Sequence, residues 1–122
     1  MIKYLQCDPR WGNSSLGESN TTLCKAGCFV TSLAMLDGRD PGVVDALLTA
    51  HGALDSNGLL DSSKAAEALG LDYSGKSNSK PDHVCIAETN YYKTSGVPQH
   101  FFVLFPDGKI WDPLGKNVTY PI

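Results

Sequence analysis

The chain has 122 residues, of which 42% are hydrophobic and 19% charged, and its formal net charge is −3 at pH 7. This length suits one hydrophobic core, so we expect a single soluble, globular domain over residues 1–122. No apolar run approaches the roughly 18 residues of a membrane-spanning helix, and the acidic balance argues against nucleic-acid binding. The first residues lack the apolar stretch of a secretory signal peptide, so we expect a cytoplasmic protein.

The first half of the chain predicts an irregular arm followed by helices. Residues 7–27 are rich in Gly, Asn, Ser, Thr and Pro and predict an irregular arm. Residues 28–36 are apolar nearly all round, which predicts a buried central helix that Gly38 terminates. A second helix should begin at Asp40-Pro41, a good cap followed by a good first residue, and end at Gly52. A third should run over 62–69, with Asp61 as its cap and Gly70 as its stop.

The last third of the chain predicts strands. Residues 83–88 form a plausible strand, and 100–105 form a stronger one whose consecutive apolar residues indicate burial on both faces. A turn over 106–108 returns the chain into a strand at 109–112. Helices followed by a hairpin indicate an α+β domain, with helices packed on a small antiparallel sheet.

The four cysteines carry the first chemical information. They are Cys7, Cys24, Cys28 and Cys85. Two disulfides would require an oxidising compartment, which no export signal supports. The gaps between the cysteines do not form the paired spacing of a zinc site, so we expect no metal. The remaining option is one nucleophile, with the other cysteines as small core or surface residues.

Cys28 stands at the start of the buried helix. Unpaired N–H groups and the positive end of the helix dipole favour a thiolate there, and the thiolate is the nucleophilic form. Gly27 has no side chain, so a substrate carbonyl can approach closely. The alternative is that Cys28 is a small hydrophobic residue that begins a core helix.

His100 and Asp112 provide a base and its orienting partner. If residues 106–108 form a three-residue turn with Gly108 left-handed, Phe102 faces Asp112 and His100 faces Leu114. His100 and Asp112 are then diagonal neighbours on one face, about 7–8 Å apart at the backbone. A two-residue turn would place them on opposite faces. Taken alone, His100 could be structural, and Asp112 could accept a backbone N–H at the strand end.

An oxyanion needs two donors, of which the Cys28 N–H is one. Gln6 carries an amide NH₂, but it reaches Cys28 only if the arm loops out and returns. Its spacing alone does not distinguish it from a surface glutamine.

Three blocks of sequence together resemble a known family. They are Tyr4-Leu5-Gln6-Cys7-Asp8-Pro9-Arg10-Trp11-Gly12, then Gly27-Cys28-Phe29-Val30-Thr31-Ser32-Leu33-Ala34-Met35, and finally His100-Phe101-Phe102-Val103-Leu104 with Trp111-Asp112-Pro113. In this order they resemble stand-alone papain-like cysteine peptidases, relatives of the double-glycine peptidases that process bacteriocin leaders. The resemblance spans residues 4–115 and implies a compact papain-like fold.

The resemblance also implies roles for single residues. Cys28 becomes the nucleophile, His100 the general base and acid, and Asp112 the orienting residue. Gln6 becomes the second oxyanion donor, a role that the resemblance alone supplies. Phe29, where many relatives have a smaller residue, could narrow the cleft. Cys24 could be a resolving thiol, but we expect Cys7, Cys24 and Cys85 to be incidental.

These inferences predict a monomeric cysteine peptidase that needs no metal or organic cofactor. Its partner would be a peptide, a protein or a cell-wall peptide. One alternative is a phage-type endolysin that cuts peptidoglycan with the same residues after release from the host cell. Another is a catalytically silent binding or inhibitor domain on this fold.

Overall fold

The secondary structure follows the order helices first, sheet last. The computed structural model describes residues 1–77, 82–89 and 100–115, and the structural statements below concern these residues. The helices are α1 (Leu23–Ala26), α2 (Cys28–Asp37), α3 (Pro41–Ala50) and α4 (Ser62–Leu69). The strands are β1 (Cys85–Thr89), β2 (His100–Leu104) and β3 (Ile110–Trp111). The described residues therefore form a small α+β domain, as the sequence predicts.

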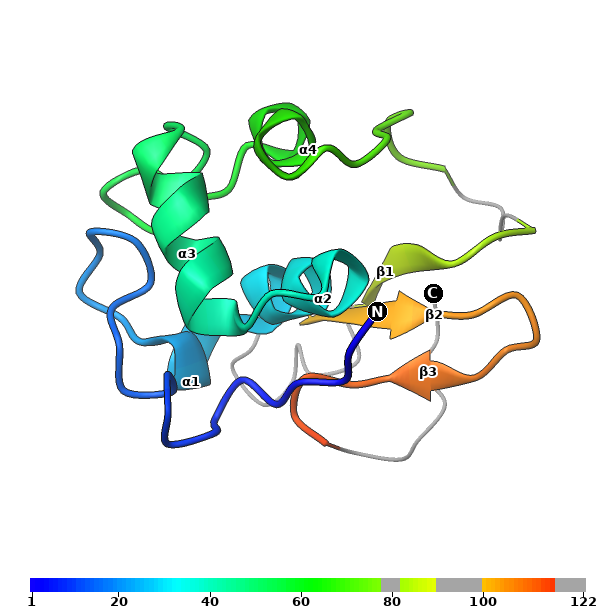
Figure 1. Cartoon of the computed structure of the whole chain (residues 1–122), viewed down its shortest axis with the longest axis horizontal. Coiled ribbons are helices and arrows are strands. Elements are labelled where there is room, and N and C mark those ends of the chain that lie inside the picture. Colours follow the sequence, from blue (N-terminus) through cyan, green and yellow to red (C-terminus); the bar gives the residue numbers. More distant parts are fainter. Residues whose placement is uncertain (78–81, 90–99, 116–122) are drawn as a thin grey trace.

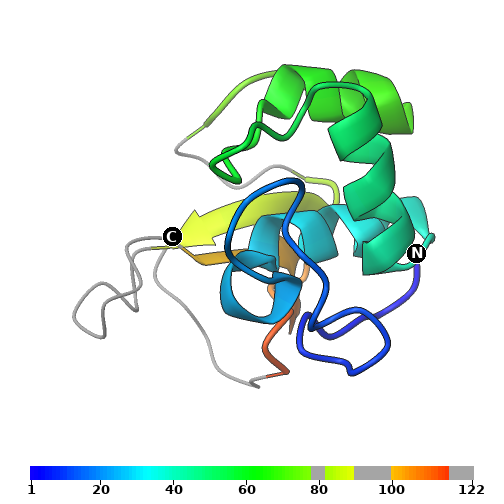
Figure 2. The ribbon, with the colours of Figure 1, turned by 90° about the vertical axis from the view of Figure 1, so that its left-hand side faces the viewer.

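Helix α2 is the central layer of the domain. It packs on β2 on one side and on α3 on the other, and α3 in turn contacts α4 (Figures 1 and 2). Val30, Ala34 and Met35 of α2 are at most 2% exposed. The larger apolar cluster gathers around α2, α3 and α4, and a smaller one lies around Ala87, Phe102 and Leu104 of the sheet. Apolar residues on nearly every side of 28–36 are explained by this double burial.

The ends of the three longer helices lie within a residue or two of the prediction. The side chains of Asp40 and Asp61 accept hydrogen bonds from Val43 N (2.9 Å) and Lys64 N (3.1 Å), as capping residues do. Gly38 (φ 94°) and Gly70 (φ 69°) take left-handed conformations at the ends of α2 and α4. These confirm the predicted signals, except that α3 ends at Ala50 with His51 as its C-cap, one residue before Gly52.

The hairpin register agrees with the prediction. The sheet is antiparallel in the order β1-β2-β3, so β2 is the central strand. Val103 pairs with Trp111 and Leu104 with Ile110, as the three-residue turn requires. Phe105 N bonds to Lys109 O at 2.9 Å, and Gly108 has a φ of 92°. The strands are shorter than expected, since β1 starts at Cys85 and β3 spans two residues.

The arm over 7–27 is more ordered than its composition predicts. It contains α1 and an isolated bridge between Ser15 and Thr22. Trp11 is 5% exposed and joins the larger core cluster, while its indole N–H donates to Leu5 O at 2.8 Å. The arm is therefore anchored in the core and does not simply lie on the surface.

A disulfide between Cys7 and Cys24 corrects one expectation. The two Cα atoms lie 4.2 Å apart, whereas Cys28 and Cys85 remain as thiols. Cys7 and Cys24 are thus neither incidental nor resolving thiols. The expectation failed because it treated the four cysteines separately from the path of the arm, and that path brings two of them together.

Among the described helices, none has the length and apolar character needed to cross a membrane.

Replacing Gly108 tests whether the turn maintains the hairpin register. Gly108→Ala should lower the free energy of unfolding by about 1–2 kcal/mol, because a Cβ is strained at positive φ. Urea unfolding measures this. The matched control is Lys109→Ala, an exposed change in the same turn that should stay within about 0.5 kcal/mol of wild type. Equal stability of Gly108→Ala and wild type would contradict the role of this turn.

Candidate active site

His100 and Asp112 form a buried pair across the β2–β3 hairpin. His100 Nε2 lies 2.8 Å from Asp112 Oδ1, and the two side chains are 2% and 0% exposed. Asp112 Oδ1 also accepts a hydrogen bond from Leu114 N at 2.8 Å. The carboxylate therefore binds the strand-end backbone and orients the imidazole at the same time. Asp112 thus accepts the strand-end N–H that the sequence offers as its alternative role, and it also lies within hydrogen-bond distance of His100.

Cys28 is the third member of this group. It is half-buried at the first position of α2, and its side chain lies close enough to His100 to raise the pKa of the imidazole. His100 Nε2 is directed at Asp112, so Nδ1 lies on the other side of the imidazole ring. Among the described residues, no side chain caps the N-terminus of α2, which leaves its first N–H groups open to another acceptor.

The charge state of His100 follows from these contacts. Burial lowers its pKa, but hydrogen bonds and charge from Asp112 and Cys28 outweigh burial and raise the pKa of His100 to about 9. His100 is therefore protonated at neutral pH, and an imidazolium lies beside the Cys28 sulfur.

Gln6 lies against α1, the turn of chain that precedes Cys28. Its side chain is 3% exposed, and Nε2 donates to Cys24 O at 2.8 Å. Nε2 also lies 3.4 Å from Leu23 O, which is long for a hydrogen bond. Oε1 of Gln6 is buried and has no hydrogen-bond partner among the described residues. One N–H of the Gln6 amide therefore makes a short hydrogen bond to Cys24 O, and the other makes only a weak one to Leu23 O.

The backbone of Gln6 connects it to the other half of the site. Gln6 N donates to Pro113 O at 2.9 Å, and Pro113 directly follows Asp112. The arm does loop out and return, so the residue that the sequence alone left as a surface glutamine lies between α1 and the strand end.

The structure shows a packing reason for Gly27. A Cβ at this position would overlap Leu23 O and lie 2.8 Å from Leu23 Cα. A glycine is therefore required because α1 and α2 meet closely here, whatever the approach of a substrate. The same contact sets the position of the N-terminus of α2.

Phe29 and Phe101 stack on each other with ring centroids 4.2 Å apart. Each directly follows a residue of the candidate site, and each is half-buried. The stacked rings join α2 to β2 next to Cys28 and His100. Phe29 therefore contributes to holding the helix against the strand.

The disulfide is the feature of this site that the sequence analysis missed. A signal was available, since any path that returns Gln6 to the nucleophile helix also returns its neighbour Cys7. Cys24 lies four residues before Cys28, so a returning Cys7 comes close to Cys24 and can form a disulfide with it.

Within residues 1–77, 82–89 and 100–115, no group of three or more His, Cys, Asp or Glu side chains is arranged to hold a metal ion.

Comparisons with protein families, with curated proteins and with solved structures find no match to this chain.

The raised pKa of His100 predicts a pH-dependent stability. Below pH 6.5, the ordinary value, folded and unfolded states both hold the proton and the stabilisation is fully present. Between pH 6.5 and about 9 only the folded state holds it, so the free energy of unfolding should fall by up to about 3 kcal/mol. Urea unfolding across this range should show a steeper fall for wild type than for His100→Gln. The exposed His51 supplies the control His51→Gln, which should keep the wild-type slope. Parallel curves for wild type and His100→Gln would contradict the pairing.

Replacing Gly27 tests the close contact that sets the start of α2. Gly27→Ala should lower the free energy of unfolding by about 1–3 kcal/mol, because the new methyl group overlaps backbone atoms of Leu23. The control is Gly38→Ala at the other end of α2, where a Cβ meets nothing within 4 Å and only positive φ is strained. The rate of Cys28 alkylation should differ from wild type in Gly27→Ala but not in Gly38→Ala. If Gly27→Ala has the stability and the Cys28 alkylation rate of wild type, the close contact with Leu23 does not set the start of α2.

Proposed function

We propose that this chain is a papain-like cysteine hydrolase that cleaves amide bonds in peptides through a thioester intermediate. One observation carries the proposal. Cys28, His100 and Asp112, from a helix start, a central strand and a strand end, lie together: His100 bonds to Asp112, and the Cys28 side chain is close enough to raise the pKa of His100. A nucleophile, a base and an orienting carboxylate in this order are the parts that acyl transfer needs.

Acylation begins with the Cys28 thiolate and the His100 imidazolium. The sulfur attacks the carbonyl carbon of the scissile amide, and the carbonyl oxygen takes up negative charge. His100 then gives its proton to the leaving nitrogen as the C–N bond breaks. Asp112 keeps the imidazole directed at the reaction and stabilises its positive charge. The products of this half-reaction are a free amine and an acyl group on Cys28.

Deacylation uses the same groups in reverse roles. His100, now neutral, takes a proton from a water molecule, whose oxygen attacks the thioester carbonyl. The C–S bond breaks, and a carboxylic acid and the original thiolate are released. These steps need only the side chains named and water.

The oxyanion would be held by two N–H groups. The Cys28 N–H at the uncapped start of α2 is one donor, and the weakly held N–H of Gln6 is the other. Each donor of this kind contributes about a hundredfold to a thousandfold in rate.

Alkylation gives the first test. Iodoacetamide at neutral pH should label Cys28 at least about tenfold faster than Cys85, since both are half-buried thiols and only Cys28 adjoins His100. Mass spectrometry of digested protein locates the label. Asp112→Asn should slow labelling of Cys28 and leave that of Cys85 unchanged. Equal labelling of the two thiols would contradict an activated nucleophile.

Hydrolysis is measured in parallel on an aminocoumarin peptide-amide panel, on casein and on purified cell-wall fragments. Turnover should vanish in Cys28→Ala and fall by roughly 10²–10⁴ in Asp112→Asn. The substrate that is cleaved separates a peptidase from a wall-lytic enzyme. Turnover that survives in Cys28→Ala would overturn the mechanism, and no turnover by wild type on any substrate would favour a silent binding domain.

A further inference from the structure

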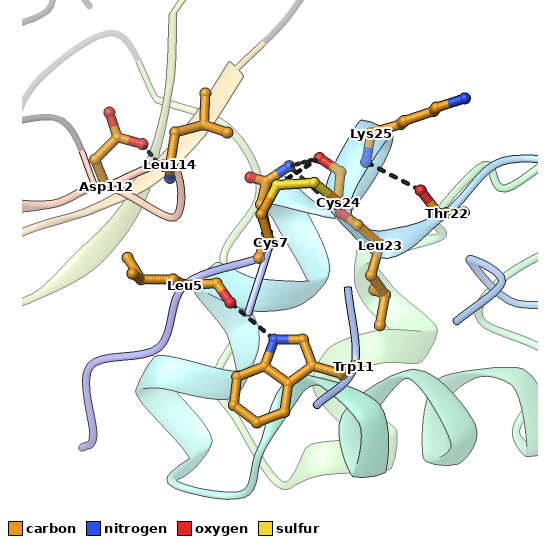
Figure 3. The surroundings of a disulfide bond; sticks show 10 residues. Leu5, Cys7, Trp11, Thr22, Leu23, Cys24, Lys25, Asp112 and Leu114 are labelled. Atoms are coloured by element: carbon orange, nitrogen blue, oxygen red, sulfur yellow. Dashed lines mark hydrogen bonds between the residues drawn. A yellow bond between two sulfur atoms is a disulfide. The ribbon is translucent and has the colours of Figure 1, made fainter. Parts of the chain in front are cut away.

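The Cys7–Cys24 disulfide lies between the two parts of the proposed oxyanion site. Cys7 directly follows Gln6, and Cys24 belongs to α1, the short helix that leads into Cys28 (Figure 3). The bond therefore joins the segment that carries Gln6 to the short helix that precedes the nucleophile.

The same residue that closes the disulfide also receives the Gln6 side chain. Gln6 Nε2 donates to the carbonyl oxygen of Cys24 at 2.8 Å, so a covalent bond and a hydrogen bond both end on Cys24. Together they close a small ring of chain around the Gln6 amide. Within that ring, the amide cannot move away from α1 without breaking the hydrogen bond or straining the ring.

Other contacts keep the arm folded without the disulfide. Trp11 is buried and bonds to Leu5 O, as Figure 3 shows, and Cys24 N donates to Gly12 O at 3.0 Å. Gln6 N remains bonded to Pro113 O. Opening the disulfide would therefore leave the arm anchored but remove the covalent constraint on Gln6, whose side chain would then be held on α1 by hydrogen bonds alone.

The disulfide is accessible to a reductant. Cys7 is exposed and Cys24 half-buried, so a dithiol can reach the sulfur of Cys7. Its first thiolate attacks that sulfur and expels Cys24 as a thiolate, which takes a proton. Its second thiolate then displaces Cys7, and the dithiol leaves as a cyclic disulfide with both electrons accounted for.

We propose that the Cys7–Cys24 disulfide is a positioning element for Gln6, so that full activity requires this pair oxidised while Cys28 is reduced. The inference rests on the proposed function and adds a redox requirement to it. Reduction leaves the nucleophile and His100 in place and displaces one oxyanion donor. A displacement of about 1 Å in such a donor costs up to about a hundredfold in rate.

The experiment compares two reactions of the same sulfur. Acylation of Cys28 by p-nitrophenyl acetate passes through an oxyanion, whereas alkylation by iodoacetamide does not. The double variant Cys7→Ser/Cys24→Ser should acylate about tenfold to a hundredfold more slowly than wild type, with alkylation within about twofold. Cys85→Ser, a cysteine change in β1, is the control and should leave both rate constants unchanged.

A double-mutant cycle shows whether the effect acts through Gln6. Gln6→Ala should slow acylation about a hundredfold, and adding Cys7→Ser/Cys24→Ser should cause no further loss. Losses that multiply in the combined variant, or a Cys7→Ser/Cys24→Ser variant that acylates as fast as wild type, would overturn the positioning role. A wild-type protein whose Cys28 is not acylated at all would instead overturn the proposed function.

A second measurement uses the unaltered chain. Wild type is titrated with dithiothreitol, the oxidised fraction of Cys7–Cys24 is followed by mass spectrometry, and acylation is measured at each point. The acylation rate should follow that fraction while alkylation of Cys28 stays constant. Acylation that is independent of the oxidised fraction would contradict the proposal, even if the double variant fails to fold.

Discussion

The buried hydrogen bond between His100 Nε2 and Asp112 Oδ1 is the interaction on which the candidate site depends. The two residues lie on one face of a hairpin only because the turn between β2 and β3 has three residues. A shift of one residue would turn Asp112 to the opposite face and leave a buried imidazole without its carboxylate. The conformation of Gly108, exposed and distant from the thiol, is for this reason part of the site.

The N-terminal segment is the second constraint, and it connects the two halves of the domain. Gln6 bonds through its backbone to Pro113, next to Asp112, and through its side chain to Cys24, next to the start of α2. Trp11 anchors the segment in the helical core. Helix and hairpin are thus held in register by a stretch of chain with little regular structure of its own.

Local signals explain why most elements were predictable. Asp40 and Asp61 cap helices, and Gly38 and Gly70 end them, through bonds within a few residues of each position. The hairpin register was predictable as well, because turn length and strand periodicity leave few alternatives. Helix α1 was not, since its four residues have no periodic pattern and Leu23, its buried residue, is 0% exposed because of distant neighbours.

The sequence by itself determined the three longer helices, the central strand and the diagonal placement of His100 and Asp112, because each depends on contacts between residues close in the chain. Only the tertiary structure decided that Cys7 pairs with Cys24 and that Gln6 is buried against α1. These features depend on the path of the arm through space. Burial of Trp11 and Leu23 in a core to which α3 and α4 also contribute sets that path. The composition of the arm does not indicate this path.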